Sequence, residues 1–184
     1  MPFKDAGIFL QCLCRTYLQN DRNGFMELIM RKELENRLYE VAPVFYSEKD
    51  LDAQDTCMCF GFECGDGWFE PLLEFSKEVA RINGIAMKSH ICFVASQIKQ
   101  KFGDIRVYWH TKSFPDMCDQ IPNREDAMRL YPMMNNAINT LVVRCRNTCE
   151  KCGTTNHIIT TDGWIQRLCV KCAEQYNRNV SSTK

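Results

Sequence analysis

Near its C-terminal end the chain carries two cysteine pairs, Cys149-Glu150-Lys151-Cys152-Gly153 and, sixteen residues later, Cys169-Val170-Lys171-Cys172. Two residues between paired cysteines allow one tight turn to direct both sulfurs at a single ion, and four sulfurs complete a tetrahedron. Gly153 supplies the backbone freedom that such a turn requires just after its second ligand. The pattern predicts one structural Zn²⁺ held by Cys149, Cys152, Cys169 and Cys172.

The residues between the two pairs suit the same site. Segments 157–160 and 164–168 flank Asp162-Gly163, which is a strong hairpin-turn signal, and residues 173–176 after the second pair are expected to be helical. A cysteine turn, a hairpin and a helix in that order predict a treble-clef finger over 147–180; a zinc ribbon, without the helix, is the alternative. Four protein ligands leave no coordination position open, so the ion is expected to be structural. Four buried free thiols, or a redox pair, fit the paired spacing less well.

The other cysteines are better explained by a reducing compartment than by disulfides. The chain has twelve cysteines, yet its first residues (1–5) lack the apolar run of an export signal. No apolar run approaches the length needed to span a bilayer. We therefore expect a cytoplasmic protein that does not enter a membrane. A second metal site built on Cys57, Cys59 and Cys64, with Cys92, Cys118 or His90 as fourth ligand, matches no established ligand spacing.

Composition predicts a packed core and a chain without bulk attraction for nucleic acid. Hydrophobic residues make up 45% and charged residues 25% of the chain, and 23 basic residues balance 23 acidic ones. From Arg144 onward, however, seven basic residues oppose three acidic ones, so this part is +4, and four thiolates with one Zn²⁺ reduce it to roughly +2. The basic residues that could contact a macromolecule are Arg144, Arg146, Lys151, Arg167, Lys171 and Arg178.

Hydrophobic periodicity predicts an α+β fold in residues 1–146. Helices are expected over 5–20 and 25–42, the second ending before Pro43, and together they form an N-terminal part, 1–43. An acidic, irregular connection follows over 44–58.

The middle part, 60–146, is expected to have the order helix, strand, strand, helix. The predicted helices run from about Pro71 to Asn83-Gly84 and over 124–146, where Pro132 must kink the helix or start a new one. Strands over 91–98 and 105–110 are expected to pair as an antiparallel hairpin, followed by a Pro-containing loop, 111–123. The predicted architecture is thus helices packed on a small antiparallel sheet, followed by the finger.

No assembled catalytic site can be recognised. The three histidines fit no Ser-His-Asp or Cys-His arrangement, and no phosphate-binding glycine loop is present. Asp66 and Glu63, with His90 or His110, could surround a second ion and act as a metal-dependent hydrolase or nuclease, although an Asp between glycines is more often a turn residue. The side chains that could form a surface for nucleic-acid contact are Arg106, Tyr108, Trp109 and Lys112, although aromatics alternating along a strand more often pack in a core.

Three strings of residues resemble a group of short, uncharacterised bacteriophage and prophage-encoded proteins. They are Cys64-Gly65-Asp66-Gly67-Trp68, then 97–108 with Lys101-Phe102-Gly103 and Arg106-Val107-Tyr108, then the Cys149–Gly153 turn with Trp164 and Leu168-Cys169. The layout is CGDGW…KFG-x-x-R-x-Y…CxxCG, and the likeness covers roughly 63–172. The resemblance implies a viral or prophage context and a C-terminal zinc finger, but no mechanism.

The sequence favours a zinc-stabilised accessory binding protein, phage-encoded and active in the host cytoplasm, which binds a host protein or a protein–nucleic-acid complex. The closed four-cysteine site, the basic C-terminal part and the lack of catalytic motifs support this hypothesis. A metal-dependent hydrolase or nuclease is the alternative, and a purely structural assembly protein is a third. No catalytic residue is assigned.

Overall fold

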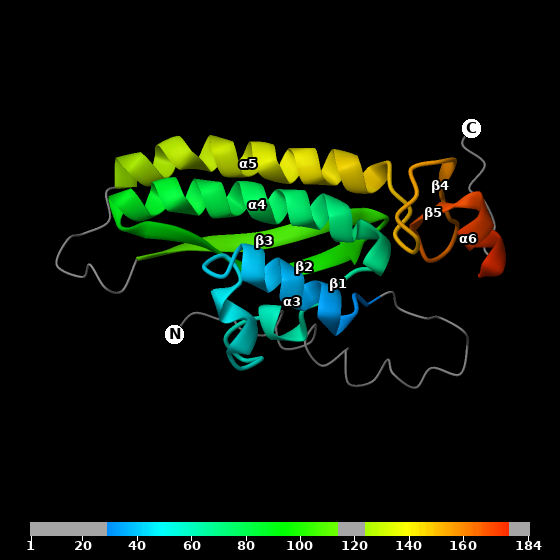
Figure 1. Ribbon diagram of the computed structural model, residues 1–184, viewed down its shortest axis with the longest axis horizontal. Coiled ribbons are helices and arrows are strands. Elements are labelled where there is room, and N and C mark those ends of the chain that lie inside the picture. The colour runs from blue at the N-terminus through cyan, green and yellow to red at the C-terminus, as the bar shows by residue number, and fades with distance from the viewer. Residues whose placement is uncertain (1–28, 114–123, 177–184) are drawn as a thin grey trace, which may run out of the picture.

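A computed structural model describes residues 29–113 and 124–176, and it shows a mixed α+β fold. In chain order its elements are α3 (Lys32–Val41), η1 (Ser47–Asp50), η2 (Met58–Phe60), β1 (Phe62–Glu63), η3 (Asp66–Trp68), α4 (Phe69–Ala86), η4 (Met87–Ser89), β2 (Ile91–Lys101), β3 (Asp104–Ser113), α5 (Arg124–Arg146), β4 (Ile158–Thr160), β5 (Arg167–Cys169) and α6 (Val170–Gln175). Helices α4 and α5 lie together over one face of the sheet β1-β2-β3, and the small β4–β5 sheet with α6 lies at one end (Figure 1).

The antiparallel pairing of β2 with β3 confirms the predicted hairpin, but both strands are longer than expected. Their register runs from Ile91 opposite Ser113 to Lys101 opposite Asp104, so the predicted loop over 111–123 was wrong in its first three residues. The turn is formed by Phe102 and Gly103, with φ angles of 54° and 75°. A two-residue turn with positive φ at both positions matches the right-handed twist of the flanking strands, which allows the ladder to continue to its end.

The helix predicted from about Pro71 is present as α4, which runs from Phe69 to Ala86, but the prediction that it stops at Asn83-Gly84 was wrong. Asn83 is buried and uses its side-chain amide to bind β2, donating from Nδ2 to the carbonyl oxygen of Phe93 (3.0 Å) and accepting its N–H at Oδ1 (2.8 Å). These tertiary hydrogen bonds therefore keep Asn83 inside the helix, although an asparagine would otherwise favour a turn. The chain turns only at His90, whose φ is 59°.

Helix α5 continues through Pro132 as one element of 23 residues, so the proline does not start a new helix (Figure 1). Met134, Leu141 and Cys145 lie on its buried side and join the main core. Packing of this side stabilises the helix beyond what local propensity would give.

The second predicted helix, 25–42, is described only from residue 29. Residues 29–31 are not helical, helix α3 begins at Lys32, and it ends at Val41, before Pro43 as predicted; the predicted part over 25–28 lies outside the described residues. The helix predicted over 5–20 lies outside the described residues. Inside α3 the buried carboxylate of Glu35 accepts the N–H of Phe62 (2.8 Å), which fixes the start of the short parallel strand β1 beside β2. This parallel strand was not predicted, because two residues give no periodicity to detect.

Aromatic side chains form the centre of the core. Phe45, Tyr46 and Phe62 are fully buried, with ring centroids 5.1 Å and 5.3 Å apart for the Phe45–Tyr46 and Tyr46–Phe62 pairs. Trp109 is partly buried and packs edge-on against Phe93 (5.2 Å) at the edge of this core, so the packing alternative holds for Trp109 but not for Tyr108, which is exposed.

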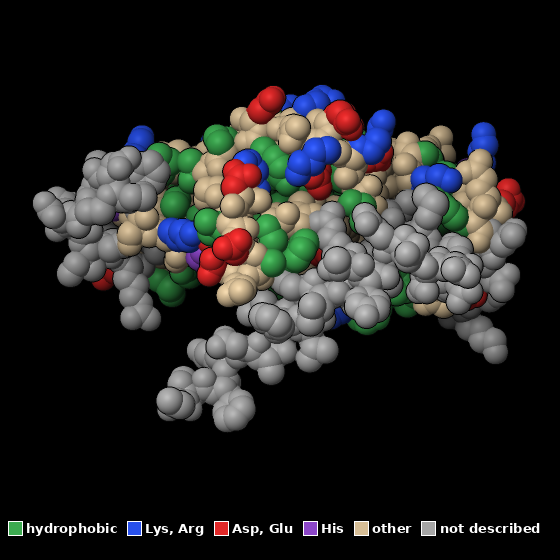
Figure 2. All heavy atoms as spheres, turned by 90° about the horizontal axis from the view of Figure 1, so that it is seen from below, with side chains coloured by type: hydrophobic (Ala, Val, Ile, Leu, Met, Phe, Trp, Pro, Cys, Tyr) green, Lys and Arg blue, Asp and Glu red, His purple; other side chains and the backbone are tan. Residues whose placement is uncertain are grey.

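Among the described side chains that are visible in Figure 2, those of Lys and Arg lie among Asp, Glu and hydrophobic ones. Among the residues that the structure describes, no helix combines the length and the apolar character required to cross a membrane.

Asn83→Ala should test the role of the buried Asn83 side-chain amide that binds Phe93. It leaves the N–H and carbonyl of Phe93 without their partners inside the core, which should lower the free energy of unfolding by roughly 2–4 kcal/mol. Gly84→Ala is the matched control, since a Cβ there meets nothing within 4 Å. Alanine at this helical position should raise the stability by up to about 1 kcal/mol. Urea unfolding followed by circular dichroism measures both, and equal stabilities would contradict the assignment.

Candidate metal centre

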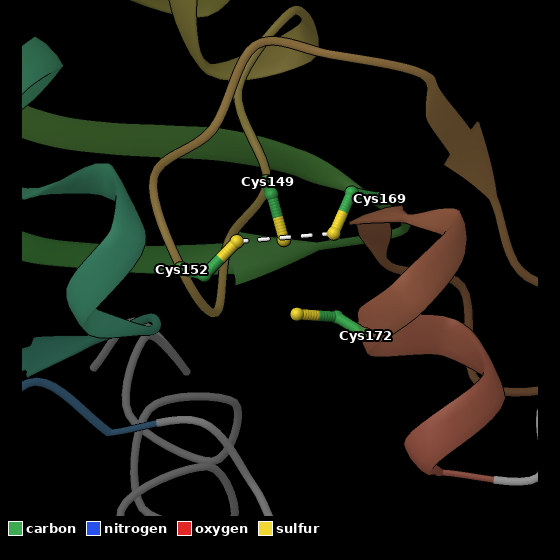
Figure 3. Close-up of side chains that lie close together, drawn as sticks. All are labelled: Cys149, Cys152, Cys169 and Cys172. Atoms are coloured by element: carbon green, nitrogen blue, oxygen red, sulfur yellow. Dashed lines mark hydrogen bonds between the residues drawn. The ribbon is translucent and has the colours of Figure 1, made fainter.

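The four cysteines of the two predicted pairs lie together at the end of the molecule (Figure 3). Cys149 and Cys152 lie on the turn that follows α5, Cys169 ends β5, and Cys172 lies in the first turn of α6. Their four sulfurs lie within 4.8 Å of one another, and the sulfurs of Cys152 and Cys169 are 3.8 Å apart. Within 29–113 and 124–176, this is the one group of three or more Cys, His, Asp or Glu side chains close enough to hold a metal ion.

The spacing between the sulfurs suits a metal ion rather than a disulfide. A bond between two sulfurs requires about 2.05 Å. Four sulfurs about 2.3 Å from a tetrahedral ion lie about 3.8 Å from each other. The sulfurs of Cys152 and Cys169 already lie at this tetrahedral distance. The other pairs of sulfurs are no more than 4.8 Å apart, so they would need to move only slightly closer to bind the same ion. The cluster could therefore hold one metal ion.

Backbone hydrogen bonds close the turn that carries the first pair. The N–H of Cys149 donates to the carbonyl of Thr154 (2.8 Å), and the N–H of Gly153 donates to the carbonyl of Cys149 (2.9 Å). Gly153 has a φ of 75°, a conformation that costs a side-chain-bearing residue free energy. This explains the glycine after the second cysteine, as the sequence indicated.

The thiols influence one another because they are close. Burial raises the pKa of Cys149, and backbone hydrogen bonds from Cys152 and Cys169 offset this only in part. Burial also raises the pKa of Cys172, and the neighbouring thiols raise it further. At Cys169 burial opposes ionisation, but hydrogen bonds from the backbone of Cys172 and from the neighbouring thiols lower the pKa. Four thiolates at this spacing repel one another, so a divalent cation is what permits all four to ionise.

The finger, defined here as residues 147–176, has a very small hydrophobic cluster of its own. Apart from the cysteines, its buried apolar members are Leu168 and Ala173, with Ile158, Ile159 and Tyr176 packed at their edges. Cys152 is exposed, whereas the other three cysteines are buried. A cluster of this size stabilises little structure alone, so the finger depends on other interactions.

The first of these interactions joins the cysteine turn to the segment 64–68. The carbonyl of Glu150 accepts the N–H of Gly67 (2.8 Å), and the indole Nε1 of Trp68 donates to the carbonyl of Thr148 (3.0 Å). The N–H of Gly65 donates to the carboxylate of Glu150 (3.3 Å). Trp68 is fully buried, so it anchors both the main core and the start of the finger.

The two glycines of this segment allow backbone to lie directly on backbone. A Cβ at Gly67 would lie 2.1 Å from the carbonyl oxygen of Cys149 and 2.6 Å from the nitrogen of Gly153. A Cβ at Gly65 would lie 2.3 Å from the carbonyl oxygen of Glu150. The string Cys64–Trp68 is thus the surface on which the cysteine turn rests. The sequence alone suggested Asp66 and Cys64 as metal ligands or turn residues and did not predict this contact, although the occurrence of the string together with the cysteine pairs was a usable signal.

A second contact joins the finger to the β2–β3 turn. Gln100 Nε2 donates to the carbonyl of Ile165, and Arg167 Nε donates to the carbonyl of Gly103 (3.3 Å). The N–H of Glu150 in turn donates to the carbonyl of Arg167 (2.8 Å), which ties β5 to the cysteine turn. The finger is therefore held at two places that are distant in sequence.

Several basic residues proposed for macromolecule contact make contacts within the protein. Arg144 pairs with Glu74, and Arg146 binds Asp104 through two hydrogen bonds of 2.8 Å. The hydrogen bond from Arg146 is the main reason that the pKa of Asp104 is lowered. Lys151 lies over the ring of Tyr176, 4.2 Å from its centroid. Arg167 makes the contact with Gly103 described above, Lys171 is exposed, and Arg178 lies outside the described residues.

The residues considered for a second metal site are not brought together. Asp66 accepts hydrogen bonds from the backbone N–H and Nε of Arg31, and Glu63 accepts one from Gln97 (2.7 Å). His110 instead lies 3.1 Å from the buried carboxylate of Glu48. Cys57, Cys59 and Cys64 form no cluster with other ligands in the described part of the chain, and Cys118 lies outside it.

Comparison with protein-family models, with curated proteins and with solved structures gives no significant match.

Gly67→Ala tests the contact between the cysteine turn and its support. The added methyl would meet backbone atoms on a segment held from both sides, so we expect the finger to separate from the core. Limited proteolysis should then cut between residues 147 and 176 at least tenfold faster, which corresponds to a loss of about 1.4 kcal/mol for the local closed state. Gly84→Ala should be cut at the rate of the unmodified protein. Unchanged cleavage of Gly67→Ala would contradict this docking.

Proposed function

We propose that the four cysteines hold one Zn²⁺ and that residues 147–176 form a treble-clef finger around it. Support comes from the order of the elements: a cysteine turn, the β4–β5 hairpin, and then α6, which begins directly after Cys169 and carries Cys172 in its first turn. Tetrahedral four-sulfur sites suit Zn²⁺ or iron, and a redox-inert ion fits a site surrounded by packing residues.

The ion has a structural role, since four protein ligands complete its coordination and no position is left for a substrate. Zn²⁺ at such a site contributes roughly 10–16 kcal/mol to the folding of its segment. That is enough to order a finger whose own hydrophobic cluster is very small. Zinc binding is therefore expected to fix the finger against the 64–68 segment and the β2–β3 turn.

The protein is an accessory binding protein whose partner is a macromolecule. The single observation that carries this proposal is the closed four-cysteine cluster at one end of a fold in which no second cluster of potential ligands is found among the described residues. A metal-dependent hydrolase requires an open or second metal site, and the carboxylates considered for one are engaged elsewhere. On the resemblance to phage and prophage proteins we propose that the protein acts in a host cytoplasm, on a host protein or a protein–nucleic-acid complex.

Metal analysis of the purified protein tests the zinc site. We expect about one zinc per chain by elemental mass spectrometry, and removal by a strong chelator should expose the finger to protease. Cys152→Ser should abolish stoichiometric zinc, because a hydroxyl is a poor replacement for a thiolate ligand. Cys152 is exposed, so this change leaves the core intact.

Cys59→Ser is the matched control, because a serine hydroxyl can keep the hydrogen bond that this thiol donates to the carbonyl of Thr56. It should bind zinc as the unmodified protein does. Stoichiometric iron in place of zinc would leave the site but change its ion. Protein that carries no metal and resists protease equally before and after chelation would refute the proposal.

A further inference from the structure

The finger and the β2–β3 hairpin together form a hollow flanked by two exposed aromatic rings. Its volume is about 280 Å³, and Phe102 and Trp164 both contribute to its lining. Phe102 is 68% exposed and Trp164 is 46% exposed, although the side chains come from segments more than sixty residues apart. The hollow exists only when the finger is docked.

Phe102 occupies its position at a conformational cost. Its φ of 54° lies in the left-handed region, which is unfavourable for a residue that bears a side chain. Glycine or asparagine would suit this turn position better. The ring is also largely exposed to water, so burial offers little compensation. A strained, exposed aromatic at a hairpin tip points to a function for the ring.

Basic side chains and a third aromatic ring surround the hollow on the hairpin. Lys99 lies over the ring of Tyr108, which is 44% exposed, and Lys101 lies over the ring of Phe102. Strand alternation puts Lys99 and Lys101 on one face of β2, and Arg106 is the register partner of Lys99 on β3. A second, larger hollow of about 760 Å³ adjoins the first, because Lys101 and Phe102 line both. Tyr108 and Arg106 line the second one.

The acidic members of the first hollow are engaged within the protein. Glu63 accepts a hydrogen bond from Gln97, and Glu150 accepts one from the backbone of Gly65. Both contacts hold these carboxylates at their places in the lining. These neutral donors leave both carboxylates charged, so the negative charge of a ligand belongs outside the first hollow, at the second one, whose lining includes Lys101 and Arg106 and, among the described residues, no acidic one. The fitting ligand is a planar ring system between Phe102 and Trp164, joined to negative charge beyond it.

We propose that this surface binds single-stranded nucleic acid, with an unpaired base between Phe102 and Trp164, a neighbouring base on Tyr108, and phosphates near Lys101 and Arg106. Stacked aromatics combined with Lys and Arg are the features by which proteins bind single strands without strong sequence preference. A duplex offers only base edges and backbone, so its bases cannot stack on the two exposed rings. The inference deepens the proposed function, because it names the macromolecule and requires the docked finger.

Binding to labelled oligonucleotides tests the proposal on the full chain, with the metal content of every sample measured. A mixed-sequence 12-mer of single-stranded DNA, the same RNA sequence and the matching DNA duplex serve as probes in fluorescence anisotropy. We expect both single strands to bind more tightly than the duplex. Single strands that bind more weakly than the duplex, or not at all, would overturn the proposal. Polyglutamate that binds as tightly as the single strands would also overturn it, in favour of a protein partner.

Variants at the rings should separate stacking from simple charge attraction. Phe102→Gly removes a ring and relieves the left-handed strain, so the protein should fold at least as well. Phe102→Gly and Trp164→Ala should each weaken single-strand binding about tenfold, the loss expected for one stacked base. Met128→Ala is the control, since Met128 is 59% exposed on the part of α5 remote from the finger. If all three variants bound single strands equally well, whether weakly or tightly, base stacking in the hollow would be contradicted.

Charge variants give an independent measurement. Lys101→Ala should reduce the slope of log Kd against log salt by about one unit, as expected for one phosphate contact. Lys77→Ala, an exposed lysine on α4, should leave the slope unchanged. Protein that binds zinc but no single strand refutes this inference alone. Single-strand binding that persists in metal-free Cys152→Ser refutes the requirement for the docked finger.

Discussion

The contact between the cysteine turn and the segment 64–68 is the constraint on which the end of the molecule depends. The two backbones lie directly on each other there, because Gly65 and Gly67 have no side chains to separate them. The buried Trp68 binds the carbonyl of Thr148 and so holds the start of the finger against the core. The metal site and the main fold are thus mechanically joined. Order that a bound ion would impose on the four sulfurs would reach the core through the carbonyls of Thr148 and Glu150.

The β2–β3 hairpin extends this support to the other side of the finger. Its turn reaches the β5 strand because the ladder continues to Lys101 and Asp104, and Arg146 at the end of α5 clamps Asp104. The hairpin, α5 and the finger therefore meet at one end of the structure (Figure 1). That convergence places Phe102 beside Trp164 and makes an exposed surface out of elements that are separate in the chain.

Buried polar groups organise the other half of the fold in a similar way. The carboxylate of Glu35 accepts the N–H of Phe62, while the amide of Asn83 satisfies both backbone groups of Phe93. Each is buried, and each connects a helix to a strand of the central sheet. Such groups are costly when unpaired, so they specify one arrangement of helix against sheet rather than merely adding stability.

Sequence alone determined what depends on local spacing: the four-cysteine cluster, the β2–β3 hairpin, the end of α3 before Pro43 and the bounds of α5. Repeats of two and of three to four residues, and pairs of cysteines with two residues between them, are imposed by strand, helix and metal geometry within one segment. Tertiary structure decided the rest. Asn83-Gly84 lies inside a helix because Phe93 binds the amide, two residues at Phe62–Glu63 become a strand because β2 lies beside them, and Gly67 is required because Cys149 rests on it. Each of these depends on a partner ten to eighty-odd residues away, and no local pattern encodes such a distance.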